Sequence, residues 1–315
     1  MTLQENQISV IDPISPAIER VKTILFRPFD LGKWFVIGFC AWLAYLGEGG
    51  GPNFNFGGQQ WNEPQIQESL HHGKEVVVNN LYWILPLVII GVLLIIALIV
   101  LLTWLSSRGR FMFLHCVALN KAEVVVPWHK FRKQGNSLFL FRIVLGLISF
   151  AVIMLLIAML VVIGVLLFAG GGGPNPLAII LMVLMAICLI IPTAIVFALI
   201  GKFTRDFVVP IMFLRQGTCM TAWREFWQLL TGNKGKFTIY ILFKIVIALA
   251  VGIIVMACVC ITCCCLGCFL AIPYIGTVLM LPILVFGRSY SLLYLRQYGT
   301  SFDVFEPETV TTLAV

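Results

Sequence analysis

The chain has 315 residues, of which 60% are hydrophobic and 11% are charged, and its mean hydropathy is +1.02. Soluble domains are about 45–50% apolar and about 25% charged, so this composition excludes a single water-soluble core and makes lipid the solvent for much of the chain. The formal net charge of +7 does not indicate nucleic-acid binding, because basic loops of membrane proteins produce such an excess and no Lys/Arg block forms a stripe.

Residues 1–33 form a polar, amphipathic N-terminal segment in which no cleavable signal peptide is visible. Apolar side chains within residues 13–29 recur at the helical period and predict an amphipathic helix. The stripe comprises Ile14, Ile18, Val21, Leu25 and Phe29. Two placements are open for this helix. It lies in the headgroup layer with its cations near anionic lipid, or it packs on the cytoplasmic mouth of a bundle.

Six apolar runs follow, at residues 34–50, 81–105, 138–169, 177–200, 237–262 and 269–287. Crossing about 30 Å of hydrocarbon takes about 20 helical residues, and five of the runs reach that length. In the first run the strongly apolar part, residues 34–46, is shorter, so a re-entrant or tilted segment is the alternative there. The sequence predicts an all-α polytopic bundle of about six spans in a membrane domain at 34–300, followed by a tail at 301–315.

The distribution of basic residues predicts the orientation. Of the 21 lysines and arginines, 20 lie in or at the edge of alternate segments between the apolar runs. Two of these basic segments lie between apolar runs, at residues 106–137 and 201–236. The loop 47–80, by contrast, carries one lysine and four glutamates. Basic residues are retained on the cytoplasmic side, so we expect both termini to be cytoplasmic and the loop 47–80 to be extracytoplasmic. Arg142 and Lys244, just inside two of the runs, are expected to snorkel back to the cytoplasmic interface.

The two large cytoplasmic segments resemble each other at an offset of 95 residues. The matched residues are Arg110, Leu119, Trp128 and Phe131 in the first and Arg205, Leu214, Trp223 and Phe226 in the second. Weaker similarities follow the last span at 294–300 and occur near the N-terminus at 18–34. The sequence therefore predicts three units, each with an amphipathic cytoplasmic helix, a glycine-containing turn and a two-helix hairpin.

A basic face that carries tryptophans is the leading functional candidate. In residues 222–230, apolar and aromatic side chains share one helical face while Arg224, Glu225 and Gln228 share the other. We expect the corresponding surface to contact lipid headgroups or a membrane or cytoplasmic protein partner. Its candidate residues are Arg110, Trp128, Phe131, Arg132, Arg205, Arg215, Trp223, Arg224, Phe226 and Trp227. The pair Arg205 and Asp206 fits a local ion pair that fixes a turn, or a headgroup contact.

Six cysteines lie close together at the outer end of the fifth run. They are Cys258, Cys260, Cys263, Cys264, Cys265 and Cys268. Three interpretations are open: small apolar residues at a tight helix contact, one or two disulfides in an oxidising compartment, or a metal or redox site based on the two C-x-x-C spacings. Only one residue separates the two C-x-x-C motifs, so wrapping them around one metal ion would require sharp local unwinding.

No catalytic constellation is visible, so we expect no enzyme activity and no cofactor. His71 and His72 with Glu68 and Glu75 fit a solvated loop better than a cation site. The rival to an organiser or partner subunit is a transporter of a small or lipidic solute, with a cavity between the hairpins. Against transport, the predicted spans contain few polar groups and no carboxylate at mid-membrane. The sequence leaves the oligomeric state open.

Two stretches of the sequence carry a resemblance to known proteins. They are Asp206-Phe207-Val208-Val209-Pro210-Ile211-Met212 with Ala222-Trp223-Arg224, and Cys263-Cys264-Cys265-Leu266-Gly267-Cys268 with Ile272-Pro273-Tyr274-Ile275-Gly276-Thr277 and Arg288-Ser289-Tyr290. The chain resembles a group of uncharacterised bacterial multi-span proteins and the membrane domain fused to some bacterial glycerophosphodiester phosphodiesterases. The resemblance implies a bacterial cytoplasmic membrane and no assigned active site. This chain shows no appended catalytic domain, so phosphodiesterase activity is not expected.

Overall fold

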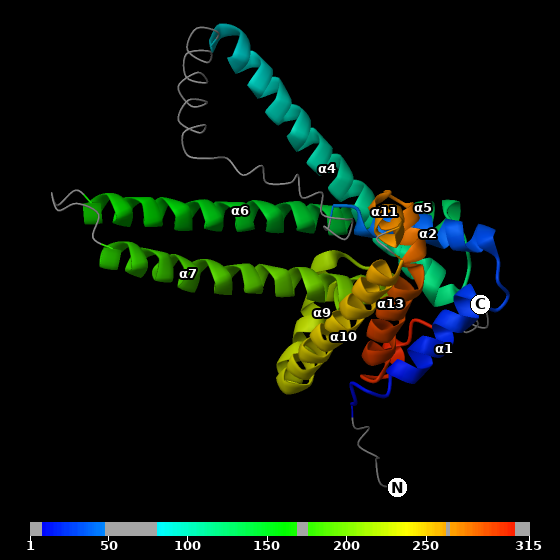
Figure 1. The fold of residues 1–315 in the computed structure, drawn as a ribbon. Coiled ribbons are helices and arrows are strands. Elements are labelled where there is room, and N and C mark those ends of the chain that lie inside the picture. Colours follow the sequence, from blue (N-terminus) through cyan, green and yellow to red (C-terminus); the bar gives the residue numbers. More distant parts are fainter. Residues whose placement is uncertain (1–7, 48–80, 169–175, 263–264, 306–315) are drawn as a thin grey trace.

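The computed structural model describes residues 8–47, 81–168, 176–262 and 265–305, and within these ranges the chain is helical with no strand (Figure 1). Four stretches are long and apolar enough to cross a membrane. They are α4 (Leu81–Leu119), α6 (Arg132–Phe168), α7 (Pro176–Phe203) with its continuation, and α10 (Lys234–Ile261). The all-helical fold class is confirmed, and four of the predicted apolar runs lie on helices of spanning length.

These helices bury one end and expose the other. Along α4, large apolar side chains from Leu85 to Leu101 are exposed, whereas those from Phe111 to Ala118 are buried. The change follows the sequence, because the run of leucine, isoleucine and valine gives way to Ser106 and Ser107, which are buried. A contiguous apolar surface of this size would drive association in water, so its natural solvent is hydrocarbon.

Helix α4 extends well beyond the predicted second apolar run at 81–105. Its 39 residues make it about 58 Å long at 1.5 Å per residue, well beyond the about 30 Å of hydrocarbon. The first part of the predicted segment 106–137 therefore continues the same helix to Leu119. Only a short helix, α5 (Val125–Lys130), separates α4 from α6 in this part of the chain.

The first predicted span corresponds to α2 (Leu31–Tyr45), which has 15 residues and packs against α4. The Asp30 side chain begins this helix by accepting a hydrogen bond from the backbone N–H of Gly32 at 2.8 Å. At about 22 Å, α2 is shorter than the hydrocarbon layer, so the re-entrant or tilted alternative stays open. The contact with α4 is close: a Cβ placed on Gly109 would lie 2.5 Å from the Leu43 carbonyl carbon.

The sixth predicted run, 269–287, is not one continuous helix. The structure divides this region into α11 (Cys265–Ala271), α12 (Ile275–Leu279) and α13 (Leu281–Arg296). The break falls at Pro273 and Tyr274, whose φ of 71° lies in the left-handed region. Proline lacks an N–H and disfavours helix at the preceding residue, which explains the break. Six spans therefore stay a prediction.

The N-terminal helix α1 (Ile14–Leu25) packs against α13 and buries Ala17, Val21, Ile24 and Leu25. Ile18 and Phe29 of the predicted stripe are exposed instead. In Figure 1, α1 and α13 lie at the same end of the molecule, while α6 and α7 run side by side away from it. The core thus sits at one end of the long helices, where α1, α2, α10 and α13 converge.

Candidate functional site

The candidate site begins at a π-helical turn. Helix α7 continues into η1 (Thr204–Val208), which is followed by α8 (Val209–Arg215). The Val209 N–H bonds the Thr204 carbonyl five residues back, which is the π-helical pattern. Pro210, the next residue, has no N–H and donates no helical hydrogen bond to the Asp206 carbonyl. Single π-helical turns often mark functional sites. This one places Asp206 in the core with 5% of its surface exposed.

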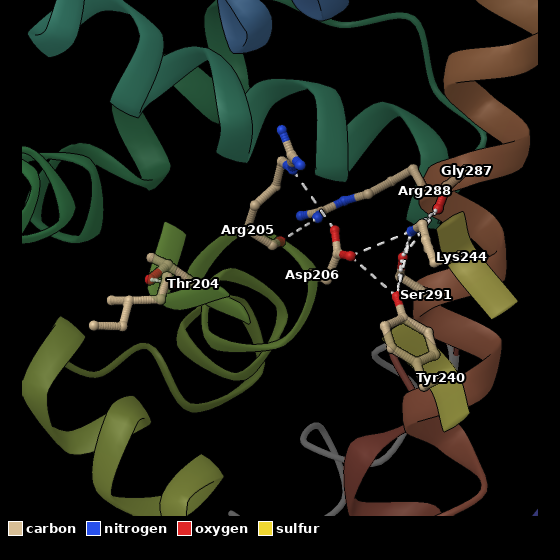
Figure 2. A network of polar contacts seen from close by, with 9 residues as sticks. Thr204, Arg205, Asp206, Tyr240, Lys244, Gly287, Arg288 and Ser291 are labelled. Atoms are coloured by element: carbon tan, nitrogen blue, oxygen red, sulfur yellow. Dashed lines mark hydrogen bonds and ion pairs between the residues drawn. The ribbon is translucent and has the colours of Figure 1, made fainter. Parts of the chain in front are cut away.

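Asp206 is the centre of a buried polar network (Figure 2). Its Oδ2 accepts a hydrogen bond from Lys244 Nζ at 3.3 Å and lies 3.1 Å from the Tyr240 hydroxyl, both on α10. Its Oδ1 lies 3.7 Å from Arg205 Nε, so the local ion pair anticipated from the sequence exists alongside a longer-range one. A buried carboxylate needs such partners, because desolvation penalises its charge.

Lys244 joins α10 to α13. Its ammonium donates to Ser291 Oγ at 2.6 Å and to the Gly287 carbonyl at 3.1 Å, in addition to Asp206. Its side chain is thus held by groups of the protein, and the expectation that it snorkels to the interface stays a prediction. Arg288 extends the network by donating through Nη1 to the Arg205 carbonyl at 2.6 Å.

Several basic residues lie around Asp206. Asp206 interacts electrostatically with Lys202, Arg205, Lys244 and Arg288, and Arg110 interacts with Arg142, Arg205 and Arg288. We call these six basic residues the cationic cluster: Arg110, Arg142, Lys202, Arg205, Lys244 and Arg288. Asp206 interacts with four of them: Lys202, Arg205, Lys244 and Arg288. Arg110 and Arg288 are each 6% exposed, so these two side chains are largely removed from water.

Two hollows adjoin the cationic cluster. A cavity of about 280 Å³ lies between α4, α6 and α7, with Arg110 and Arg142 in its lining. The Arg142 Nη1 donates to Ser106 Oγ at 3.1 Å. A second hollow of about 530 Å³ follows α10 from Lys244 to Val259 and is apolar except for Lys202 and Lys244 at one end.

The structure distributes the predicted face over the core and the surface. Arg110, Phe131 and Phe226 are buried, Trp128, Arg205 and Trp223 are partly buried, and Arg132, Arg215, Arg224 and Trp227 are exposed. The buried rings are core residues: Phe131 stacks on Phe213 at 4.8 Å between centroids, and Phe226 stacks on Phe207 at 5.2 Å. Of the predicted face, Arg132, Arg215, Arg224 and Trp227 are thus the members that lie at the surface.

The structure describes the side chains of three of the six cysteines near the end of α10. Cys258, Cys260 and Cys268 are exposed free thiols. Cys263 and Cys264 lie outside the described residues, as does the side chain of Cys265. Among the described residues, no three His, Cys, Asp or Glu side chains gather in a way that could hold a metal ion. His71 and His72 lie outside the described residues.

Sequence reasoning missed the pairing of Asp206 with Lys244. The available signal was a lysine inside an apolar run of α10 together with an aspartate at the end of another run, because two such charges are stable at a helix contact when they meet. The repeat alignment pairs Arg110 with Arg205, and the structure brings both into the cationic cluster. The threefold repeat itself stays a prediction.

Comparison with known proteins places the chain in a family. The model of a family of unknown function (DUF7544) matches residues 8–295. No curated protein and no solved structure matches the chain. The matched range includes all six residues of the cationic cluster and Asp206, so these groups belong to the part of the chain that the family model describes. The chain is a member of the DUF7544 family.

Proposed function

We propose that this protein is a non-enzymatic membrane protein that organises anionic lipid at its cytoplasmic face. The proposal includes six spans in the bacterial cytoplasmic membrane, with both termini in the cytoplasm. Positive charge in alternate segments supports this orientation, because lysine and arginine are retained on the cytoplasmic side. The resemblance to phosphodiesterase membrane domains is compatible with such a role and adds no catalytic step.

The observation that carries the proposal is the outer side of α9 (Cys219–Gly232). Its inner side buries Cys219, Ala222 and Phe226. Met220 and Trp227 on the other side are 69% and 58% exposed, and Arg224 lies between them at helical spacing. Large apolar side chains beside a cation are typical of helices at the surface of an anionic membrane.

The orientation is tested with single cysteines at two positions in intact cells. A membrane-impermeant maleimide should label Gly58→Cys in the loop 47–80 and should not label Lys234→Cys at the start of α10. Lysed cells supply the control, because both positions should then react. Labelling of both positions from the outside contradicts the orientation.

Lipid contact is tested with the full chain in nanodiscs. A polarity-sensitive fluorophore on Met220→Cys should shift to the blue when phosphatidylglycerol replaces phosphatidylcholine, because anionic headgroups draw α9 toward the bilayer. Arg224→Gln should reduce the shift, while Lys121→Gln, an exposed cation in the turn before α5, should leave it unchanged. Equal emission in the two lipids contradicts the proposal.

A second candidate is a transporter of a lipidic solute, and the hollow along α10 favours it. The hollow runs from Lys244 to Val259, a rise of about 22 Å along the helix, and so extends deep into the span. Val255→Trp should slow translocation of a fluorescent phospholipid in proteoliposomes, whereas Ile253→Trp on the exposed side should not. A translocation rate equal to that of protein-free vesicles eliminates this candidate.

A further inference from the structure

We propose that α5 is an interfacial anchor, whose exposed Val125 and Val126 side chains enter the bilayer at the level where headgroups meet acyl chains. This inference goes beyond lipid contact through α9, because it concerns another element and requires no anionic lipid. The partner of α5 is the same bilayer that α4 and α6 cross.

The lipid-facing surfaces of α4 and α6 define the level of this boundary. Exposed large apolar side chains of α4 end at Leu101, and those of α6 begin at Leu140. Trp104 follows Leu101 by three residues, about 4.5 Å along the helix. Asn136 precedes Leu140 by four residues, about 6 Å. The headgroup layer is about 5–7 Å thick on each side of the hydrocarbon, so Trp104 and Asn136 fall within it.

A cluster of aromatic and polar side chains holds α5 at this level. The Trp128 ring of α5 meets the Trp104 ring edge-on, with 5.8 Å between centroids. The Arg108 guanidinium carbon lies 4.4 Å from the Trp104 centroid and 4.7 Å from that of Trp128, which is a cation–π geometry. Asn136 Oδ1 accepts hydrogen bonds from Trp104 Nε1 and Arg108 Nη2, both at 3.3 Å. Helices α4, α5 and α6 are thereby joined beside the end of the lipid-facing surface.

Helix α5 has a buried side and an exposed side. Pro127 and the C-cap residue Phe131, four positions apart, are buried. Val125 and Val126 are 68% and 54% exposed. Single exposed valines are ordinary on a water-facing surface, so the level of these two carries the argument. They precede Trp128 by two or three positions, a rise of about 3–4.5 Å along the helix, and thus continue the hydrocarbon-facing surface of α4.

The neighbours of the two valines are typical of a segment at a membrane surface. Arg132 and Lys133, at the start of α6, are exposed, and Trp128 is partly exposed. Interfacial segments combine tryptophan and basic side chains with apolar ones, because the polar groups stay among the headgroups while the apolar groups enter the acyl region.

The far end of α4 provides a contrast. Leu119 follows Leu101 by 18 residues, about 27 Å along the helix, which is well beyond the headgroup layer. The chain therefore leaves the bilayer along α4, and α5 returns to the bilayer surface before α6 crosses it. Residues 106–137 are thus a cytoplasmic excursion with one point of membrane contact.

The experiment is photolabelling of the unchanged full chain in nanodiscs of phosphatidylcholine that carries a diazirine on one acyl chain. After irradiation and trypsin digestion, mass spectrometry should find lipid adducts on the peptide 122–130. A diazirine next to the glycerol should label this peptide more strongly than a diazirine at the chain terminus, because α5 is shallow. The peptide that contains residues 85–101 of α4 is the positive control, and the peptide 111–121 should carry few adducts.

Matched variants test the valine contact. Val126→Asp should lower the adduct yield of 122–130 at least about fivefold, because the favourable transfer of the valine out of water is lost. Ile11→Asp makes the same kind of change at a side chain that is 65% exposed in the N-terminal segment, and it should retain the full yield. Labelling of the α4 peptide shows in each variant that the protein is still inserted.

Three results would overturn the inference: no adduct on 122–130 while α4 is labelled, an unchanged yield in Val126→Asp, or equal labelling of 122–130 by the two diazirine positions. The first is the result expected if a protein partner or a second copy of the chain covered α5. Failure here is distinguishable from failure of the proposed function, because the α5 adducts should form in pure phosphatidylcholine, whereas the fluorophore on α9 should respond to phosphatidylglycerol.

Discussion

Lys244 Nζ lies 3.3 Å from Asp206 Oδ2, and this ion pair joins α10 to the π-helical turn after α7. Both side chains are largely removed from solvent, at 15% and 7% exposed. Neither charge is readily hydrated by bulk water, so each depends on the other and on the hydroxyls around them. The pair also connects to α13 through Ser291.

Separating this pair should destabilise the protein strongly. Asp206→Asn and Lys244→Met should each lower the free energy of unfolding by about 3–5 kcal/mol, because each leaves a buried charge without its nearest counter-charge. The double variant should lose less than the sum of the two. Equilibrium unfolding in detergent measures the coupling. Additive losses would show that the two charges do not stabilise each other.

The close approach of α2 to α4 should make Gly109 intolerant of any side chain. In Gly109→Ala the new methyl group would overlap the backbone of Leu43 and Ala44, so we expect a loss of about 1–3 kcal/mol or more. Gly91→Ala on the same helix is the control, because its Cβ would meet open space. Thermal unfolding of both variants measures the difference. Equal melting temperatures would contradict the described packing of α2 on α4.

Cys219 should react slowly with maleimide while the protein is folded. Burial raises the pKa of its thiol to about 12, which lowers the thiolate fraction near neutral pH about 1,000-fold relative to an ordinary thiol of pKa 9.0. Folding therefore favours the neutral thiol of Cys219. Burial of this thiol contributes its full free energy to stability below pH 9, and the contribution is lost as pH rises from 9 toward 12, because the thiol ionises in the unfolded chain first.

The measurement is the alkylation rate of a variant in which Cys219 is the single cysteine. The folded rate should be low at pH 7 and should rise with pH, and unfolding should abolish the protection. Rapid labelling of the folded protein at pH 7 would place Cys219 outside the core.

The three described cysteines of the outer group should be free. Cys258, Cys260 and Cys268 are free thiols in the structure. No disulfide therefore links these three to one another. Alkylation of the denatured, non-reduced protein followed by peptide mass spectrometry should find all three modified. Prior reduction should not increase their modification. A disulfide-linked peptide that contains any of the three would support the alternative of a covalent link.

Several features of the fold could be predicted from the sequence. The apolar runs at 81–105, 138–169, 177–200 and 237–262 predict helices, and each lies on a helix of spanning length. Hydropathy is the sum of local properties, and crossing hydrocarbon requires about 20 apolar helical residues in sequence. Pro273 is also a local signal, since a missing N–H interrupts a helix wherever it occurs inside one.

The candidate site depended on tertiary structure. Phe131 and Phe226 have the chemistry of docking residues, yet the packing of α8 and η1 against them makes them core. Arg110 and Arg142 are 32 positions apart, and nothing in that spacing indicates that they line one cavity. The preference of a side chain for lipid or water is carried by the residue itself, and the sequence determined it. The partner of a buried charge depends on which helices meet, and the tertiary structure decided that.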